Sequence, residues 1–134
     1  MATDNEIIHQ CLEAVASSHT DIAPAVYASV SEKMPDMDQH IGFMDNRMRG
    51  RMLDQIYKLL LGDVDNGYLE FEARMHQGYG ADLAQYRGLL QAVKDAVSNV
   101  LSDTWSAAED AAWNRSIEHI VGEISVVLHN RPTR

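Results

Sequence analysis

One histidine is distinguished by its surroundings. His76 ends a short apolar segment at residues 68–75, and Gly78 and Gly80 follow it closely. Glycine permits sharp turns, so the imidazole of His76 either caps the end of a helix or points into a pocket as a ligand. Neutral imidazole is the commonest metal ligand among protein side chains. The histidines at positions 9, 19, 119 and 129 have no spacing that makes a metal site.

The sequence lacks the usual signatures of nucleophilic and nucleotide chemistry. It contains no Gly-rich phosphate loop, no nucleophile elbow and no Ser/His/Asp arrangement in a plausible frame. Cys11 is the sole cysteine, which excludes an internal disulfide and favours a reducing compartment. The first residues show no basic region followed by an apolar block, as a secretory signal would. We therefore expect a cytoplasmic protein.

Length and charge limit the partners that the chain can have. Its 134 residues correspond to one domain, and 46% hydrophobic and 23% charged residues are typical of the globular class. A net charge of −9 argues against nucleic acids and anionic membrane surfaces, because both require a surplus of Lys and Arg. No apolar run is long enough to span a bilayer. We expect a single domain over residues 1–134 with no nucleic-acid or membrane partner.

The elements that must position His76 are predicted to be helical. Apolar residues recur at the helical period in five or six segments, whereas strand-like alternation is nowhere sustained. The predicted helices begin at Thr3 or Asp4, near Asp21, at about Asn46, at Tyr68, near Asp82 and after Ser106. Pro35 stops the second helix and Gly62 ends the third, with a short turn or loop predicted at residues 35–43 and a loop at residues 62–67. The apolar stripe of the third helix consists of Met48, Met52, Leu53, Ile56, Leu59 and Leu60. The predicted fold class is all-α.

Two aromatic residues stand in a fixed frame with His76. Tyr86 lies 10 residues after it, and Trp113 lies 37 residues after it in the segment AEDAAW. This frame resembles the C-terminal half of bacterial globins, especially single-domain globins and the globin domain of flavohaemoglobins. Residues 74–120 follow that family pattern without a gap, and VYASVSEKMP (26–35) resembles the second helix of the family. The resemblance implies the globin fold, a three-over-three helical sandwich.

The resemblance also implies a haem pocket and assigns residues to it. His76 would be the axial ligand of a haem b that is held non-covalently, because Cys-x-x-Cys-His is absent. Tyr27 and Arg49 would act on the opposite, distal side as a hydroxyl donor and a fixed cation. Arg47 or Arg51 would replace Arg49 if the helix were shifted by one turn. The cofactor-binding residues would be Ile41, Phe43, Met48, Met52, Leu53, Tyr79 and Tyr86.

Two positions depart from the family pattern. The family places a phenylalanine against the haem six residues after the proline, where this chain has Ile41, with Phe43 two residues later. It often supplies a glutamate from the last helix to strengthen the proximal histidine, where this chain has Leu128. Glu118 and Glu123 are the alternatives for that role.

The implied chemistry is the binding of O2, NO or another small haem ligand. A tyrosine donor favours firm oxygen binding, so oxidation of nitric oxide to nitrate with electrons from a separate reductase is the implied turnover. A gas or redox sensor acting through a partner is one alternative. A haem-free globin-fold interaction module is another, supported by Ile41 and by the short segment between Asn66 and His76. His40 is a candidate second axial ligand, and the chain would be a monomer or a homodimer formed through its last two helices.

Overall fold

The computed structural model describes residues 3–37, 44–62 and 83–129. Within these ranges five α-helices and two 3₁₀ turns follow in the order α1 (Asp4–Ser17), α2 (Ala23–Lys33), η1 (Pro35–Met37), α4 (Asn46–Leu61), α6 (Leu83–Leu101), η2 (Ser102–Thr104) and α7 (Ala107–His129). No strand occurs in the same ranges, so the predicted all-α class is confirmed for them. The helix predicted at residues 68–75 lies outside the described part of the chain.

Local capping residues set the helix ends, as the sequence predicts. Thr3 precedes α1, and its hydroxyl accepts a hydrogen bond from the Glu6 amide at 3.1 Å. Asp45 does the same for α4, where its carboxylate accepts from the Met48 amide at 2.9 Å. Gly62 ends α4 with φ of 72°, a left-handed conformation that favours glycine. Such side chains satisfy amides that have no partner inside the helix.

Two local predictions can be compared with the structure. The short turn or loop predicted at residues 35–43 begins with the 3₁₀ turn η1, which buries Met37, so a turn is confirmed for its described part. The apolar stripe predicted for α4 includes Met48, yet this side chain is 42% exposed, whereas Leu53 is 5% exposed. Met48 and Leu53 are five residues apart, so their side chains point in directions about 140° apart around the helix axis. Met48 therefore lies on the flank of the stripe rather than at its buried centre.

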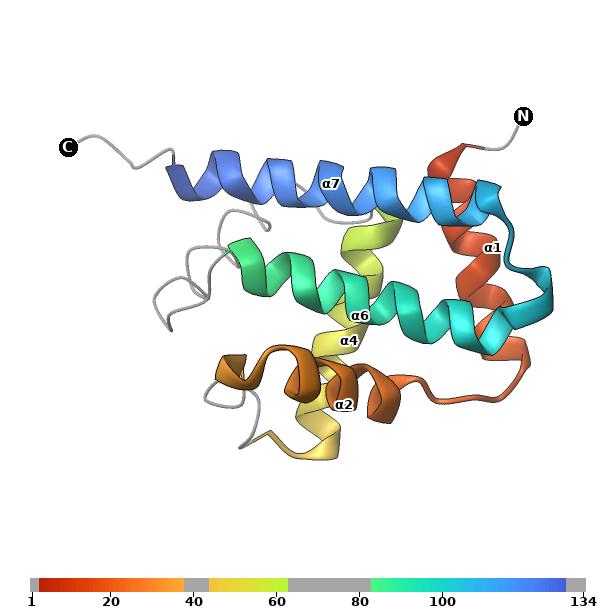
Figure 1. The fold of residues 1–134 in the computed structure, drawn as a ribbon, viewed down its shortest axis with the longest axis horizontal. Helices are drawn as coiled ribbons and strands as arrows, with labels where there is room; N and C mark the ends of the chain where they lie inside the picture. Colours follow the sequence, from red (N-terminus) through yellow and green to blue (C-terminus); the bar gives the residue numbers. More distant parts are fainter. Residues whose placement is uncertain (1–2, 38–43, 63–82, 130–134) are drawn as a thin grey trace.

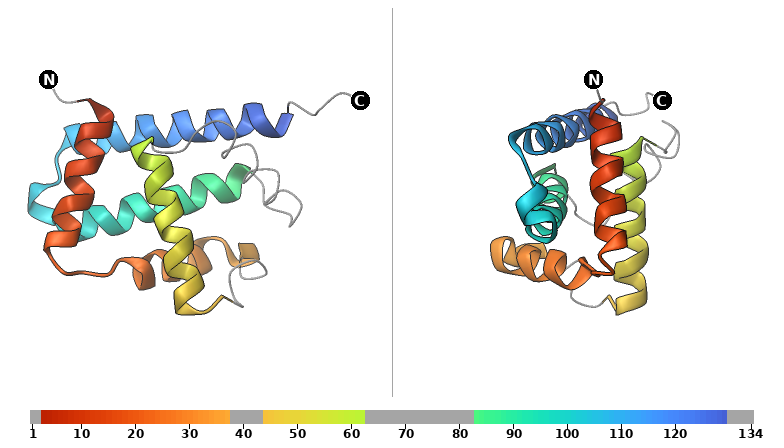
Figure 2. Two further views of the ribbon diagram at one scale, coloured as in Figure 1. Left: turned by 180° about the vertical axis from the view of Figure 1, so that it is seen from behind. Right: turned by 90° about the vertical axis from the view of Figure 1, so that its right-hand side faces the viewer.

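The helices are arranged in two layers (Figures 1 and 2). In one layer α2, α6 and α7 lie side by side, with α6 in the middle. In the other layer α1 and α4 run across these three helices, and α1 also packs against α4. The buried apolar stripes of all five helices therefore face a common core between the layers. None of the described helices is both long and apolar enough to cross a membrane.

Large apolar side chains fill the core between the two layers. Trp113 of α7 and Ile8 of α1 are fully buried, and α6 contributes Val93 and Val97 at the same depth. The other large side chains with less than 2% exposure are Val26, Val30, Leu60, Ile117 and Ile124. Apolar burial of this kind is the main favourable contribution to folding. It also explains why the helical periodicity of the sequence is so regular.

Ion pairs join helices on the outside of this core. Arg115 of α7 contacts Asp4 of α1 at 2.8 Å, and Arg87 of α6 contacts Glu118 of α7 at 2.8 Å, each through two hydrogen bonds. Lys94 of α6 is only 8% exposed; its ammonium contacts the carboxylate of Asp110 and the amide oxygen of Asn114, both at 2.9 Å. These pairs hold the register of α7 on its neighbours.

The three carboxyl groups predict a loss of stability in acid. Hydrogen bonds from Arg115, Arg87 and Lys94 lower the pKa of Asp4, Glu118 and Asp110 below their usual values. A lowered pKa in the folded state contributes stability above the unfolded-state pKa, and this contribution is lost as the pH falls through the folded-state pKa. We expect the midpoint of urea unfolding to be constant from pH 7 to about pH 5 and to fall below about pH 4.

A matched variant checks this pH dependence. Asp4→Asn, Asp110→Asn and Glu118→Gln remove the three titrating groups and keep side chains of similar size. The triple variant is expected to have a lower urea midpoint at pH 7 and a shallower fall in acid. An acid profile as steep as that of the unchanged chain would show that other groups control the transition.

Candidate functional site

Tyr27 lies where α2 meets α4, and it is the polar residue at the centre of the candidate site. It is 3% exposed, and Val26 and Val30 of the same helix are buried as well. The Tyr27 hydroxyl donates a hydrogen bond to the backbone carbonyl oxygen of Arg49 at 2.9 Å. This bond joins α2 to α4 across 22 residues of sequence. The two residues assigned to the distal side are therefore neighbours in the fold.

Arg49 places its charge against the ring of the same tyrosine. The guanidinium carbon lies 5.0 Å from the centroid of the Tyr27 ring, within the range of a cation–π contact. Leu53, one helical turn further along α4, is buried beside them. Arg47 and Arg51 are exposed, whereas Arg49 is half-buried. The structure therefore favours Arg49, and not a shifted register, as the cation at this site.

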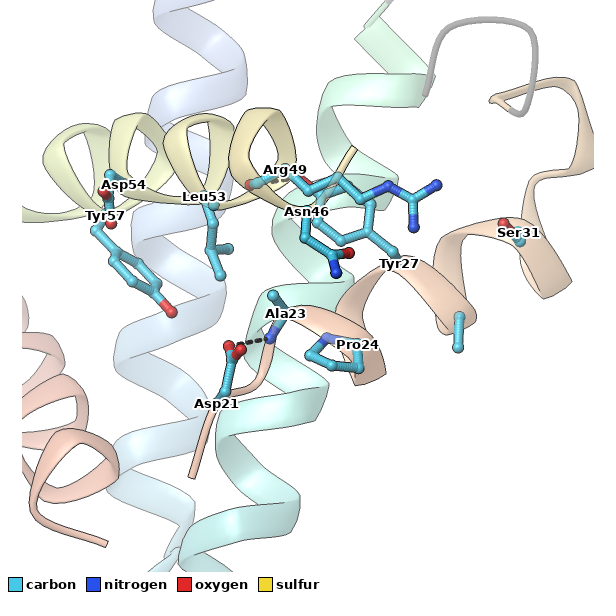
Figure 3. A pocket seen from close by; sticks show the side chains of 12 residues that line it. Asp21, Ala23, Pro24, Tyr27, Ser31, Asn46, Arg49, Leu53, Asp54 and Tyr57 are labelled. Atoms are coloured by element: carbon cyan, nitrogen blue, oxygen red, sulfur yellow. Dashed lines mark hydrogen bonds between the residues drawn. The ribbon is translucent and has the colours of Figure 1, made fainter. Parts of the chain in front are cut away.

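A groove opens to solvent along the crossing of α2 and α4 (Figure 3). It encloses about 580 Å³ and has Tyr27, Leu53 and Tyr57 among its lining residues. Asp21 and Asp54 line the part near Tyr57, and Figure 3 shows the Arg49 guanidinium directed away from them. The remaining lining residues are Ala23, Pro24, Ala28, Ser31, Asn46 and Gly50. The groove is thus acidic at one end and basic at the other.

Both tyrosines of the groove are held in the neutral form. Burial raises the pKa of Tyr27 to about 12, and the nearby Arg49 charge opposes this rise only in part. Burial also raises the pKa of Tyr57 to about 12, reinforced by the carboxylates of Asp21 and Asp54. Each phenol therefore keeps its proton, and remains a hydrogen-bond donor, throughout the physiological pH range.

These pKa values predict an alkaline transition. A folded-state pKa above the unfolded value of 10.0 contributes stability that is present below pH 10 and lost as the pH rises toward about 12. We expect the absorbance of tyrosinate to show a late component near pH 12, and Tyr27→Phe and Tyr57→Phe each to remove part of it. Full titration of all tyrosines near pH 10, with the helical signal retained, would contradict the burial of both phenols.

The other predicted site residues divide into two groups. Met52 and Tyr86 are partly buried, on α4 and α6, and pack against the core. Met48 is exposed, so the structure gives no support to its place in a pocket wall. Residues outside the described part of the chain are His40, Ile41, Phe43, His76 and Tyr79.

The two glutamates of α7 are engaged elsewhere. Glu118 forms the pair with Arg87, and Glu123 lies 3.0 Å from His119 in an exposed i,i+4 pair. Both carboxylates are on the outer side of α7, away from the core. Their relation to His76 lies outside the described residues. The side chain of Leu128 lies outside the described residues.

Sequence reasoning missed Tyr57, Asp54 and Asp21 as site residues. Tyr57 follows Arg49 and Leu53 at intervals of four residues, so the helical period alone places these three on one side of α4. That signal was present in the sequence. The position of Asp21 was not predictable in the same way, because it depends on how α2 approaches α4; its carboxylate accepts a hydrogen bond from the Ala23 amide at 3.0 Å (Figure 3).

No protein-family model and no curated protein matches the chain. Within the residues that the structure describes, no group of three or more His, Cys, Asp or Glu side chains is placed to hold a metal ion. The all-α fold and the neighbouring Tyr27, Arg49 and Leu53 are therefore the observations from which a function must be argued.

Proposed function

We propose that the chain is a haem-binding globin, similar to the bacterial single-domain globins, that acts on O2 or NO. The order of the helices in the two layers carries this proposal. Helices α1 and α4 form one layer and α2, α6 and α7 form the other. A three-over-three globin needs one more helix in the first layer, between α4 and α6 in the chain. The helix predicted at residues 68–75, which ends at His76, would supply it.

The described residues fit the distal side of a haem b pocket. Leu53 and Met52 present apolar surface on the inner side of α4, where water must be kept away. Tyr27 adds a buried phenol, and Arg49 adds a cation 5.0 Å from the phenol ring. Haem, when bound, would supply reversible binding of a diatomic gas at ferrous iron, and His76 is the residue that would hold it.

Tyr27 would hold the gas by hydrogen bonding. Its proton now points to the carbonyl oxygen of Arg49 at 2.9 Å. Rotation about the bond between the ring and the hydroxyl oxygen redirects this proton without moving the buried ring. The raised pKa keeps the group protonated, so Tyr27 stabilises a partly negative ligand as a donor. The Arg49 carbonyl then loses one hydrogen bond, which limits the net gain.

Arg49 would favour ligands and products that carry negative charge. The Tyr27 ring orients its guanidinium, and the buried Leu53 beside it reduces screening by water. Oxidation of nitric oxide by oxygen gives the nitrate anion, for which a nearby cation is suited. We therefore propose nitric oxide oxidation as the turnover, with electrons from a separate reductase.

Nitric oxide consumption tests this function. Haem-loaded protein is kept in the ferrous state by an enzymatic electron donor, without dithionite, and is mixed with oxygen and nitric oxide. An electrode follows the concentration of nitric oxide, and the nitrate formed is assayed separately. We expect stoichiometric nitrate, and a slower rate in Arg49→Gln than in the control Arg87→Gln, which removes an exposed cation outside α4. Nitric oxide loss no faster than with free haem would exclude the turnover and leave gas binding alone.

The described parts of α6 and α7 do not favour a sensor that acts through an apolar partner surface. Among the described residues of these helices, Val126 is the large hydrophobic side chain that is exposed, at 60%. One such side chain is normal on a protein surface and does not make a patch.

A further inference from the structure

The cations of the described chain are distributed unevenly between paired and unpaired positions. Outside α4, each described Lys or Arg lies within 3.4 Å of a carboxylate oxygen. These pairs are Lys33–Asp95, Arg87–Glu118, Lys94–Asp110 and Arg115–Asp4. Their charges are largely neutralised locally, so they add little to the field of the surface.

Three cations on α4 behave differently. Arg47, Arg51 and Lys58 are exposed, and none of them contacts a carboxylate among the described residues. Their spacings of four and seven residues put them on one side of α4, and we call this side the cationic ridge. The whole chain has a net charge of −9, yet α4 carries four cations and one carboxylate. That carboxylate, Asp54, lies on the same side between Arg51 and Lys58, so this side carries three cations and one anion. The ridge is therefore a local positive surface on an acidic protein.

An exposed apolar side chain borders the ridge. Met48 is 42% exposed and lies beside Arg47 and one turn from Arg51. Arg and Met are both enriched in protein interfaces, and Met adapts to irregular contacts. An exposed methionine beside arginines therefore suits a contact with another protein.

We propose that the cationic ridge is the docking surface for a separate electron-donor protein that presents an acidic surface. This inference rests on the proposed haem function, because the turnover requires electrons. The ridge lies on the outer side of α4, whereas Arg49 and Leu53 lie on its inner side. A donor on the ridge would thus be separated from the distal side by about 10 Å, the diameter of one helix.

Charge and symmetry favour a protein over other occupants. Anionic membranes are usually recognised by clusters of four to eight Lys or Arg, and nucleic acids by a broadly basic face. Three cations on a chain of net charge −9 meet neither requirement. A symmetric dimer through the ridge would oppose cation to cation, because both copies present the same patch. At physiological salt, charges further apart than about 8 Å are largely screened from one another. Binding therefore depends on the charges of the partner that lie next to the ridge, rather than on the net charge of either protein.

Binding to a purified acidic flavodoxin tests the proposal, with flavodoxin immobilised and the haem-loaded protein in solution. The test variant is Arg47→Gln, Arg51→Gln and Lys58→Gln together. The matched control is Lys33→Gln, Arg87→Gln and Arg115→Gln, which changes the net charge equally but at paired cations. We expect the test variant to bind about 10-fold or more weakly, the control to bind within about twofold, and binding to weaken from 20 to 200 mM salt.

Four outcomes would overturn the proposal. One is an equal loss in both variants, which would indicate an effect of net charge alone. Another is binding to vesicles containing phosphatidylserine, or to duplex DNA, with none to flavodoxin. A third is flavodoxin binding by a protein that takes up no haem, which would remove the electron-donor role together with the proposed function. Haem uptake without flavodoxin binding would overturn the docking surface alone and leave the haem function intact.

Discussion

Replacement of Trp113 by alanine is expected to lower the free energy of unfolding by about 3–5 kcal/mol. Trp113 has no exposed surface and lies in the core where α7 meets α1 and α6. Its ring centroid is 6.2 Å from that of Trp105, which packs against the edge of the core. Truncation removes the largest fully buried side chain and leaves a cavity that rigid helices close only in part. Urea unfolding followed by circular dichroism measures the change.

Two further variants make this prediction specific. Trp113→Phe retains an aromatic ring and is expected to cost less than the alanine variant. Trp105→Ala removes a side chain that is only partly buried and is also expected to cost less. A Trp113→Ala protein within about 1 kcal/mol of the unchanged chain would contradict the described packing of α7 against α1 and α6.

The Tyr27→Phe variant is expected to release oxygen about 10- to 100-fold faster than the unchanged haem-loaded protein. The reason is the loss of one hydrogen bond to a partly charged ligand, about 1.5–3 kcal/mol. The ring itself is retained, so the core around this 3% exposed side chain keeps its packing. Stopped-flow displacement of oxygen by carbon monoxide measures the dissociation rate.

Tyr57→Phe is the matched control for this experiment. Tyr57 lines the same groove and has a similarly raised pKa, of about 12, but it lies near Asp21 and Asp54 rather than against Arg49. Its removal is expected to leave oxygen dissociation within about twofold of the unchanged protein. If oxygen dissociated equally faster from both variants, the effect would come from a general change in the groove, and Tyr27 would have no specific role.

Helix positions were predictable from the sequence because their signals are local. The boundaries predicted for α4, from about Asn46 to the residue before Gly62, match the structure. An Asp cap at one end and a left-handed glycine at the other explain this agreement. Met48 is the instructive exception, since methionine is common both in cores and at exposed interfaces.

Contacts between distant segments were not predictable from spacing. The Tyr27–Arg49 bond spans 22 residues and the Arg115–Asp4 pair spans 111. The helical period of a sequence does not indicate which helices contact one another. The nearness of Tyr27 to Arg49 was therefore predictable only from the resemblance to globins. The Asp21 carboxylate near Tyr57 had no such guide and emerged from the structure alone.

Haem titration of the purified protein tests the central claim most directly. Hemin is added to the folded protein and to His76→Ala, with His9→Ala and His119→Ala as controls at exposed histidines. The haem-globin account predicts a sharp Soret band that saturates at one haem per chain, is lost or shifted in His76→Ala, and is unchanged in both controls. A folded protein that takes up no haem, or an identical band in His76→Ala, would contradict it.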